Sequence, residues 1–357
     1  MSENNSGNSS GIMRSRRVLL RAGATAAAGA ALGLPAWVGA QGAPVKIRYA
    51  TGGGIGPNEM ETVIFLDWMQ KNVLRQYGKD YVVDMTYTRG TPEAATLLAA
   101  GQADMATLSF SVFATLMLKG AVPDGLSIVA DNYQDAKPGY AANTFFVLEG
   151  SPIRKVEDLR GKRIGVNAYG SAVDLGLRVR LKKSGLDARK DVEIVEVAFP
   201  NIGAALREKR IDCGVLVIPF MVNETAKGGL RALFNGGDAF GTYAPIFQVA
   251  TRAFIKSNRP AVSAFLADYV RGLQWFYDPA NRKQAIALTA GFTKSSPDVL
   301  DSYFMTGKDY YRDRNACVNA ELIQRPVDAM VEQGLIPQPL KIADYLDPSL
   351  LPGTCAS

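Results

Sequence analysis

Short apolar segments alternate with amphipathic segments along most of the chain, which is the pattern of an α/β protein. The first set of predicted elements comprises strands at 45–50, 82–88 and 105–108 and helices at 58–77 and 91–101. Asn58 and Glu61 have the spacing of a capping box at the start of the first helix. Thr91 is the expected N-cap of the second helix, because Pro92 then occupies the first helical position.

A second set of elements repeats this order about one hundred residues later. It comprises strands at 162–166, 193–197 and 210–216 and helices that open at 171 and 200. An offset of 108 positions superposes Pro92 on Pro200 and Asp104 on Asp212. We therefore expect two lobes of related topology, with a cleft where the carboxyl ends of their strands face each other.

The remaining segments connect these lobes and extend the chain. Extended stretches at 143–148 and 244–251 are the expected crossings, and the predicted tail helices span 260–277, 281–290, 297–306 and 320–333. We predict a first lobe from 41–145 plus 246–357 and a second lobe from 146–245.

The first forty residues have the layout of a bacterial export signal. A polar start is followed by the basic block around Arg16 and Arg17, an apolar stretch from 22 to 37, and a cleavage pattern ending at Ala40. The paired arginines favour the twin-arginine type. The alternative is a membrane anchor, but the stretch is shorter than the roughly 20 residues that a span needs.

Several sequence blocks resemble a known family. The block "VEDLRGKRIGV" at 156–166, the "FFV" strand before it, and the helix at 254–279 resemble type II periplasmic substrate-binding proteins of ABC importers. The similarity is to the nitrate, sulfonate and taurine class, which includes binders of thiamine-pyrimidine precursors, and it covers roughly residues 45–346. The resemblance implies an α/β fold of the Venus-flytrap type, in which each lobe is a mixed sheet flanked by helices.

The resemblance also implies a function. Such proteins capture a small molecule between two hinged lobes and deliver it to an ABC permease with a cytoplasmic ATPase. We therefore expect a periplasmic monomer that is exported through the twin-arginine translocon, has its signal cleaved, and uses no cofactor. The expected ligand is a small organic anion, a sulfonate or carboxylate with an aliphatic or aromatic body.

The composition of the chain excludes several kinds of catalytic site, metal site and binding partner. The chain of 357 residues has no histidine, which excludes Ser-His-Asp and Cys-His catalytic sets and metal sites that need imidazole. The export signal takes four Arg and one Glu with it, so the net charge falls from +6 to +3. No basic block remains for a nucleic acid partner. Of the three cysteines, Cys213 is expected to be buried, and whether Cys317 and Cys355 form a disulfide stays open.

The candidate ligand-binding residues follow predicted strands. Gly170 and Ser171 open a helix, where free backbone N–H groups and the helix dipole favour an anion. Gly53 and Gly54 belong to the corresponding glycine-rich turn of the first lobe; Glu59 breaks the dinucleotide-binding pattern of that turn. Thr91 either contacts the ligand or only caps its helix.

Further candidates lie where later strands end. They are Ser109, Phe110, Asn132, Pro219 and Phe220. An aromatic side chain at such a place either stacks on a planar ligand or packs in the core.

Two other functions remain open at this point. Receptors of tripartite, ABC-independent transporters share the fold, and relatives that make thiamine pyrimidine consume an active-site histidine that this chain lacks. We therefore predict a binding protein rather than an enzyme.

Overall fold

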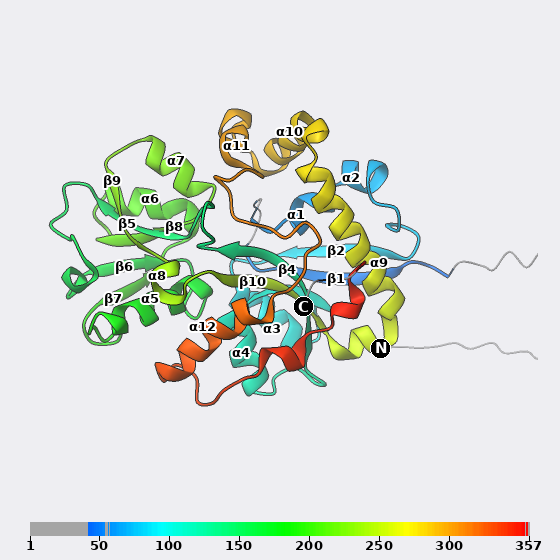
Figure 1. The fold of residues 1–357 in the computed structure, drawn as a ribbon, viewed down its shortest axis with the longest axis horizontal. Coiled ribbons are helices and arrows are strands. Elements are labelled where there is room, and N and C mark those ends of the chain that lie inside the picture. Colours follow the sequence, from blue (N-terminus) through cyan, green and yellow to red (C-terminus); the bar gives the residue numbers. More distant parts are fainter. Residues whose placement is uncertain (1–41, 54–55, 57, 354, 356–357) are drawn as a thin grey trace, which may run out of the picture. The chain divides into compact units, whose positions relative to one another are not determined.

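Two five-stranded mixed sheets organise the chain (Figure 1). The computed structural model describes residues 42–357 apart from 54, 55, 57, 354, 356 and 357. The predicted export signal, with Arg16, Arg17 and Ala40, lies outside the described residues.

The first sheet has the strand order β2-β1-β3-β10-β4. Its strands are β1 (Val45–Thr51), β2 (Tyr81–Tyr87), β3 (Met105–Ser109), β4 (Leu126–Asp135) and β10 (Tyr243–Thr251). β1 pairs in parallel with β2 and β3, whereas β10 is antiparallel to β3 and β4. The carboxyl ends of β1, β2 and β3 therefore lie at one edge of the sheet.

The second sheet repeats this plan with the order β7-β6-β8-β5-β9. Its strands are β5 (Thr144–Leu148), β6 (Arg163–Val166), β7 (Glu193–Glu196), β8 (Cys213–Leu216) and β9 (Leu230–Asn235). β6 pairs in parallel with β7 and β8, and β5 is antiparallel to β8 and β9. The α/β class and the two related sheets are thus confirmed.

The repeat extends to single side chains. The Asp104 carboxylate accepts a hydrogen bond from the Arg48 backbone N–H at 2.9 Å, and Asp212 accepts from Arg163 at the same distance. In both lobes the aspartate turns the chain from a helix into the third parallel strand. The sequence offset of 108 therefore reflects a true structural correspondence.

Helices cover both sheets (Figure 1). They are α1 (Glu61–Ile64), α2 (Asp67–Asn72), α3 (Thr91–Ala99), α4 (Phe110–Leu118), α5 (Ala172–Lys183), α6 (Phe199–Arg207), α7 (Phe220–Ala226), α8 (Gly237–Phe240), α9 (Arg252–Tyr277), α10 (Arg282–Thr293), α11 (Pro297–Tyr303) and α12 (Ala320–Glu332). The tail helices α9 to α12 match the predicted segments to within a few residues, except that α9 starts earlier and bends at Asn258 before Pro260.

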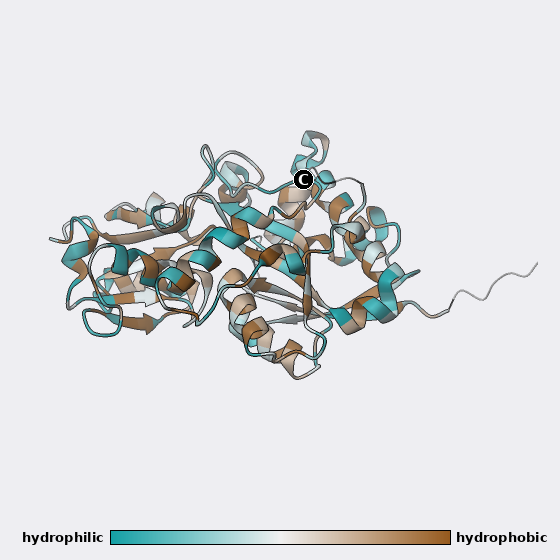
Figure 2. Cartoon of the chain, turned by 60° about the horizontal axis from the view of Figure 1, so that its bottom comes forward, coloured by the Kyte–Doolittle hydropathy of each residue, from teal (hydrophilic) through white to brown (hydrophobic). Residues whose placement is uncertain are grey.

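Alternating residues of a strand pack into separate hydrophobic cores on the two faces of the sheet. In β1, Ile47 and Tyr49 pack under α1 and α9, while Ala50 points to the opposite face, under α3, α4 and α12. A third core lies between the second sheet and helices α5 and α6. Figure 2 shows the strands of both sheets in mostly hydrophobic colours and many helix surfaces in hydrophilic colours.

The predicted helix at 58–77 is wrong. The chain forms two short helices there, α1 and α2, separated by the extended residue Leu66. The second of them, α2, ends at Asn72. The capping box does not form, because the Asn58 amide donates to the carbonyl of Ile218 and the Glu61 carboxylate accepts from Tyr49. Tertiary partners have replaced the local contacts that the spacing suggested.

Thr91 is likewise not the N-cap of α3. Gly90 holds that position, and the Thr91 hydroxyl donates to the Ser109 hydroxyl at 3.0 Å. Pro92, which was predicted at the first helical position, is the second residue of α3 and still lies in its first turn. The side chain that was expected to close its own helix instead joins two helix starts.

The chain passes between the sheets twice, after β4 and after β9. Asp135 holds these crossings together, since its buried carboxylate accepts from the backbone N–H groups of Ala136 and Asn143 and from the Tyr243 hydroxyl. β5 begins at Thr144 and β10 at Tyr243, close to the limits expected for the lobes. The lobe limits of 41–145 plus 246–357 and 146–245 remain predictions.

Candidate ligand-binding site

A cavity of about 910 Å³ lies between the carboxyl edges of the two sheets. The first lobe contributes the turn after β1 and the starts of α3 and α4, and the second lobe contributes the starts of α5, α6 and α7. Polar and apolar groups both line it. The size and mixed lining are typical of small-molecule sites.

Helix N-termini from both lobes meet at this cavity. Thr91 and Pro92 begin α3, Ser109 caps α4, Ser171 caps α5, and Pro200 lies in the first turn of α6. The first backbone N–H groups of a helix have no partner within it, and the helix dipole is positive there. The arrangement can therefore stabilise negative charge from two sides.

Ser171 shows how the sequence builds one of these ends. Its hydroxyl accepts from the Asp174 backbone N–H and lies 2.9 Å from the Asn167 side-chain oxygen. Gly170, just before it, has φ 76°, a left-handed conformation that favours glycine. The glycine thus allows the sharp turn from β6 into α5.

The structure brings most of the predicted site residues together. Those that line the cavity are Gly53, Thr91, Ser109, Ser171, Pro219 and Phe220. Gly54 lies outside the described residues.

Three predicted residues lie elsewhere. Phe110 is fully buried and packs edge to face against Phe240 and Tyr243, so it is a core residue. Asn132 is buried behind the wall, where its amide nitrogen lies 3.4 Å from Glu61. Gly170 does not line the cavity; its N–H donates to Asp174 and its carbonyl accepts from Ser111.

Sequence reasoning missed several polar residues of the wall. They include Asn58, Glu59, Asn143, Asn167 and Glu196. Glu59 carried a usable signal, since an acid next to a glycine-rich turn at a strand end is placed to enter the same cleft. The others depend on chain crossings and loop paths that no local pattern encodes.

The glycine turn after β1 makes room for Glu59. The Gly52 N–H donates to the Glu59 carboxylate at 2.7 Å. A Cβ added to Gly53 would lie 2.7 Å from Glu59 Oε1, closer than real side chains allow. Burial raises the pKa of Glu59 well above its usual value, and the neighbouring Glu61 raises it further.

Charged groups on the lining are mostly paired. Arg89, before α3, forms an ion pair with Glu93 at 3.2 Å, and the Glu196 carboxylate accepts from the Tyr169 backbone N–H at 2.6 Å. Among the described residues, no group of three His, Cys, Asp or Glu side chains is placed to hold a metal ion.

Direct contacts close the cavity at its rim. The Ser111 hydroxyl of α4 donates to the Gly170 carbonyl at 2.8 Å, which joins the two lobes. A Cβ added to Gly90 would lie 3.5 Å from the Ala168 Cβ. The described arrangement is thus one in which the lobes touch across the cleft.

A segment from the first lobe reaches the second lobe behind the cavity. This segment, residues 304–319, is termed the strap. The Tyr310 hydroxyl accepts from the Ile218 backbone N–H at 3.0 Å and donates to the Asn143 side-chain oxygen at 2.6 Å. Asn58 donates to the Ile218 carbonyl from the other side. Lobe-two backbone is therefore held by two lobe-one side chains.

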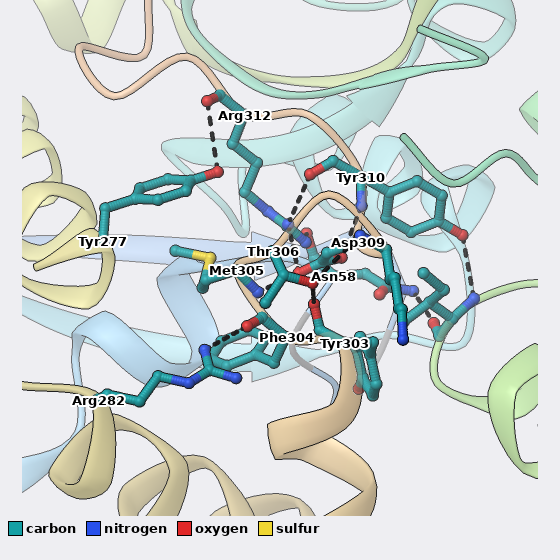
Figure 3. Close-up of polar contacts among 12 residues, drawn as sticks. Asn58, Tyr277, Arg282, Tyr303, Phe304, Met305, Thr306, Asp309, Tyr310 and Arg312 are labelled. Carbon is teal, nitrogen blue, oxygen red and sulfur yellow. Dashed lines mark hydrogen bonds and ion pairs between the residues drawn. The ribbon is translucent and has the colours of Figure 1, made fainter. Parts of the chain in front are cut away.

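A buried ion pair shapes the strap. Arg312 and Asp309 lie 2.9 Å apart, and both side chains are almost completely buried. The Asp309 carboxylate also accepts from the backbone N–H groups of Met305 and Tyr310 (Figure 3). Cys317, near the end of the strap, forms a disulfide with Cys355, which answers the question that the sequence left open.

Free Cys213 is buried in β8, and burial raises the pKa of its thiol. It is a packed residue of the third core, as expected. Among the helices of the described residues, none combines the length and hydropathy needed to cross a membrane.

Comparisons with known proteins agree with this architecture. A family model described as NMT1/THI5 like matches residues 75–282. A protein of Escherichia coli (strain K12), named as an aliphatic sulfonates-binding protein, is 27% identical over 231 residues, which cover 64% of this chain and 70% of that protein.

Two solved structures have the same fold. The alkanesulfonate-binding protein SsuA from Xanthomonas axonopodis pv. citri, bound to MOPS, superposes with a TM-score of 0.64 at 21% identity and covers 86% of this chain and 99% of its own. The periplasmic nitrate-binding protein NrtA from Synechocystis PCC 6803 has a TM-score of 0.64 at 12% identity, covering 86% and 87%. The two-lobed fold of periplasmic binding proteins is thereby established.

Proposed function

Because the chain belongs to the NMT1/THI5-like family, we propose that it is the periplasmic solute-binding component of an ABC importer. It captures a small organic anion in the cavity and delivers it to a membrane permease with its ATPase. The observation that carries the proposal is the meeting of helix N-termini from both lobes at one cavity of about 910 Å³. The name of the Escherichia coli relative, aliphatic sulfonates-binding protein, agrees with an anion.

The size of the cavity favours an organic ligand over a bare inorganic oxyanion. Its volume lies in the range of sites that hold drug-sized molecules, and Val217, Phe199 and Phe220 supply apolar lining. The helix N-termini can bind the sulfonate or carboxylate group of the ligand. The three apolar side chains can pack against its aliphatic or aromatic body.

Binding and closure form one process in this proposal. The ligand stabilises the arrangement in which Ser111 meets Gly170, because its anionic head contacts helix starts of both lobes. The closed monomer then docks on the permease. With no histidine in the chain and relatives named as binding proteins, we propose no catalytic role.

A thermal-shift screen tests the ligand class. We expect methanesulfonate, butane-1-sulfonate, benzenesulfonate or benzoate to raise the melting temperature, because they bind the native state. Neutral isosteres such as the methyl sulfone of the same chain length should leave it unchanged. Stabilisation by neutral or cationic compounds alone would overturn the anion proposal.

Ser171→Trp provides the matched variant for the site. A bulky ring at the start of α5 fills cavity volume and should abolish the ligand-induced shift. Ser184→Trp, at the opposite end of the same helix, should retain it. An unchanged shift in Ser171→Trp would remove Ser171 from the site.

The route to the periplasm is a separate proposal. We propose export through the twin-arginine translocon and cleavage after Ala40. Replacing both Arg16 and Arg17 by Lys should retain the uncleaved chain in the cytoplasm, as judged by fractionation. Export of that variant in mature form would contradict this route.

A further inference from the structure

Two buried carboxyl groups lie together in the wall of the cavity. Glu59 lines the cavity with only 3% of its surface exposed, and Glu61 is completely buried. Glu61 lies close enough to Glu59 to raise the pKa of the Glu59 carboxyl group. Glu59 and Glu61 are called the carboxyl pair below.

The described hydrogen-bond donors to the carboxyl pair are all neutral. Glu59 accepts from the Gly52 N–H, while Glu61 accepts from the hydroxyls of Tyr49 and Thr107 and lies 3.4 Å from the Asn132 amide nitrogen. Two ionised carboxylates at such a place repel each other and lose hydration. One proton on the pair removes one of these two charges and with it the repulsion between the carboxylates.

We propose that the carboxyl pair holds one proton when the anion binds, so that ligand capture takes up a proton from solution. This inference rests on the proposed function, because it concerns the charge that the anionic ligand meets. With the proton, the pair carries one negative charge, and Glu59 presents a neutral carboxyl group to the cavity. Without it, a second negative charge faces an anion across a short, poorly screened distance.

Other groups around the pair do not take over this role. Burial raises the pKa values of the surrounding tyrosines, so they stay neutral at the pH values where carboxyl groups titrate; they are Tyr49 of β1, Tyr133 of β4 and Tyr269 of α9. The charged groups farther from the carboxyl pair already form ion pairs or hydrogen bonds of their own. They are the Arg89–Glu93 ion pair, Glu196 on the second lobe, and the Arg312–Asp309 pair of the strap.

The geometry of the glycine turn supports the same view. The Gly52 N–H and the space above Gly53 fix the Glu59 carboxyl group at the cavity wall instead of letting it turn into solvent. An acidic residue that served only for solubility would not need this hydrogen bond or the space above Gly53. The carboxyl pair therefore sets the charge of the lobe-one wall.

The test is a titration with butane-1-sulfonate and benzenesulfonate between pH 5.5 and 10, a range in which a sulfonate keeps its charge. For the mature protein we expect the Kd to rise with pH, approaching about tenfold per pH unit once the pair loses its proton. Calorimetry in two buffers of different ionisation enthalpy should show proton uptake on binding. This second measurement needs no variant.

Glu59→Gln imitates the protonated group with nearly the same shape. We expect this variant to bind with a Kd that is independent of pH and to take up no proton, so it binds more tightly than the unsubstituted protein at high pH. Asp131→Asn is the matched control, because Asp131 is also a buried, titrating carboxyl of lobe one but does not line the cavity. It should keep the pH slope.

The outcomes separate the two proposals. If no sulfonate binds at any pH, the proposed function itself is wrong. If sulfonates bind the unsubstituted protein with a constant Kd and without proton uptake, the function stands and the shared proton is excluded. A pH slope that persists in Glu59→Gln would likewise place the proton elsewhere.

Discussion

The Tyr310 hydroxyl accepts a hydrogen bond from the Ile218 backbone N–H at 3.0 Å, and this bond joins the strap of lobe one to the end of β8 in lobe two. The same hydroxyl donates to Asn143 in the first crossing. Tyr310 is completely buried and stacks on Tyr133, a residue of the cavity lining. One phenol thus links the strap, a crossing and the second lobe.

Tyr310→Phe tests this link. The variant leaves the Ile218 N–H and the Asn143 oxygen without their partner, so we expect a loss of about 1–3 kcal/mol in the free energy of unfolding. Denaturant unfolding measures it. Tyr311→Phe is the neighbouring control, because the Tyr311 ring is half-buried and packs beside Lys137. A smaller loss in Tyr310→Phe than in Tyr311→Phe would contradict the assigned role.

Ser111→Ala removes the hydrogen bond that joins the lobes at the rim. The Gly170 carbonyl then loses its 2.8 Å donor, and the closed arrangement loses about 1 kcal/mol relative to the open one. We expect the ligand Kd to rise about fivefold, with little change in the unfolding of the ligand-free protein. The measurement is calorimetric titration with the anion identified by the screen. An unchanged Kd would mean that this bond does not contribute to closure.

The disulfide between Cys317 and Cys355 closes a long loop, since the two cysteines have a sequence separation of 38. Replacing both residues by Ser should cost about 4 kcal/mol through the entropy of the unfolded chain. Thermal unfolding with and without dithiothreitol checks this. The reductant should lower the melting temperature of the unsubstituted protein and leave the double variant unaffected. Equal sensitivity of the two proteins would place the effect outside this disulfide.

Stability should fall as the pH rises from about 4 to 8. Burial raises the pKa of Asp131 to about 7 and that of Asp135 to about 6 in the folded protein. Their stabilising effect is therefore complete below the pKa of the unfolded chain, near 4, and is lost as the pH rises through 6 to 7. In Asp131→Asn, we expect the decline to shrink by a few kcal/mol, as measured by denaturant unfolding at pH 5 and 8. A decline as steep as that of the unsubstituted protein would contradict the assignment.

The internal repeat was readable in the sequence because it rests on local rules. Pro92 and Pro200 both lie in the first turn of a helix, and Asp104 and Asp212 both accept from a backbone N–H of the neighbouring parallel strand. Helix starts and strand alternation depend on residues near in sequence. Their prediction therefore survives in the structure.

The region around Asn58 shows where such rules fail. A capping box was expected there, but Asn58 and Glu61 find partners 160 positions and 12 positions away, in Ile218 and Tyr49. Local sequence also leaves the side chain of Phe110 undecided, because an aromatic ring at a strand end can face either the ligand or the core. Phe110 packs in the core because it contacts Phe240 and Tyr243, which lie far away in the sequence.

The sequence by itself determined the α/β class, the two related lobes, the tail helices and most of the helix starts at the cavity, since each depends on periodicity and capping over a few residues. The tertiary structure decided the Cys317–Cys355 pairing, the place of the strap behind the cleft and the burial of Glu59 in the cavity wall, where the Gly52 N–H holds it. Those features join segments that are distant along the chain or turned by an irregular loop. Their geometry follows from how the sheets pack, which no local pattern of residues specifies.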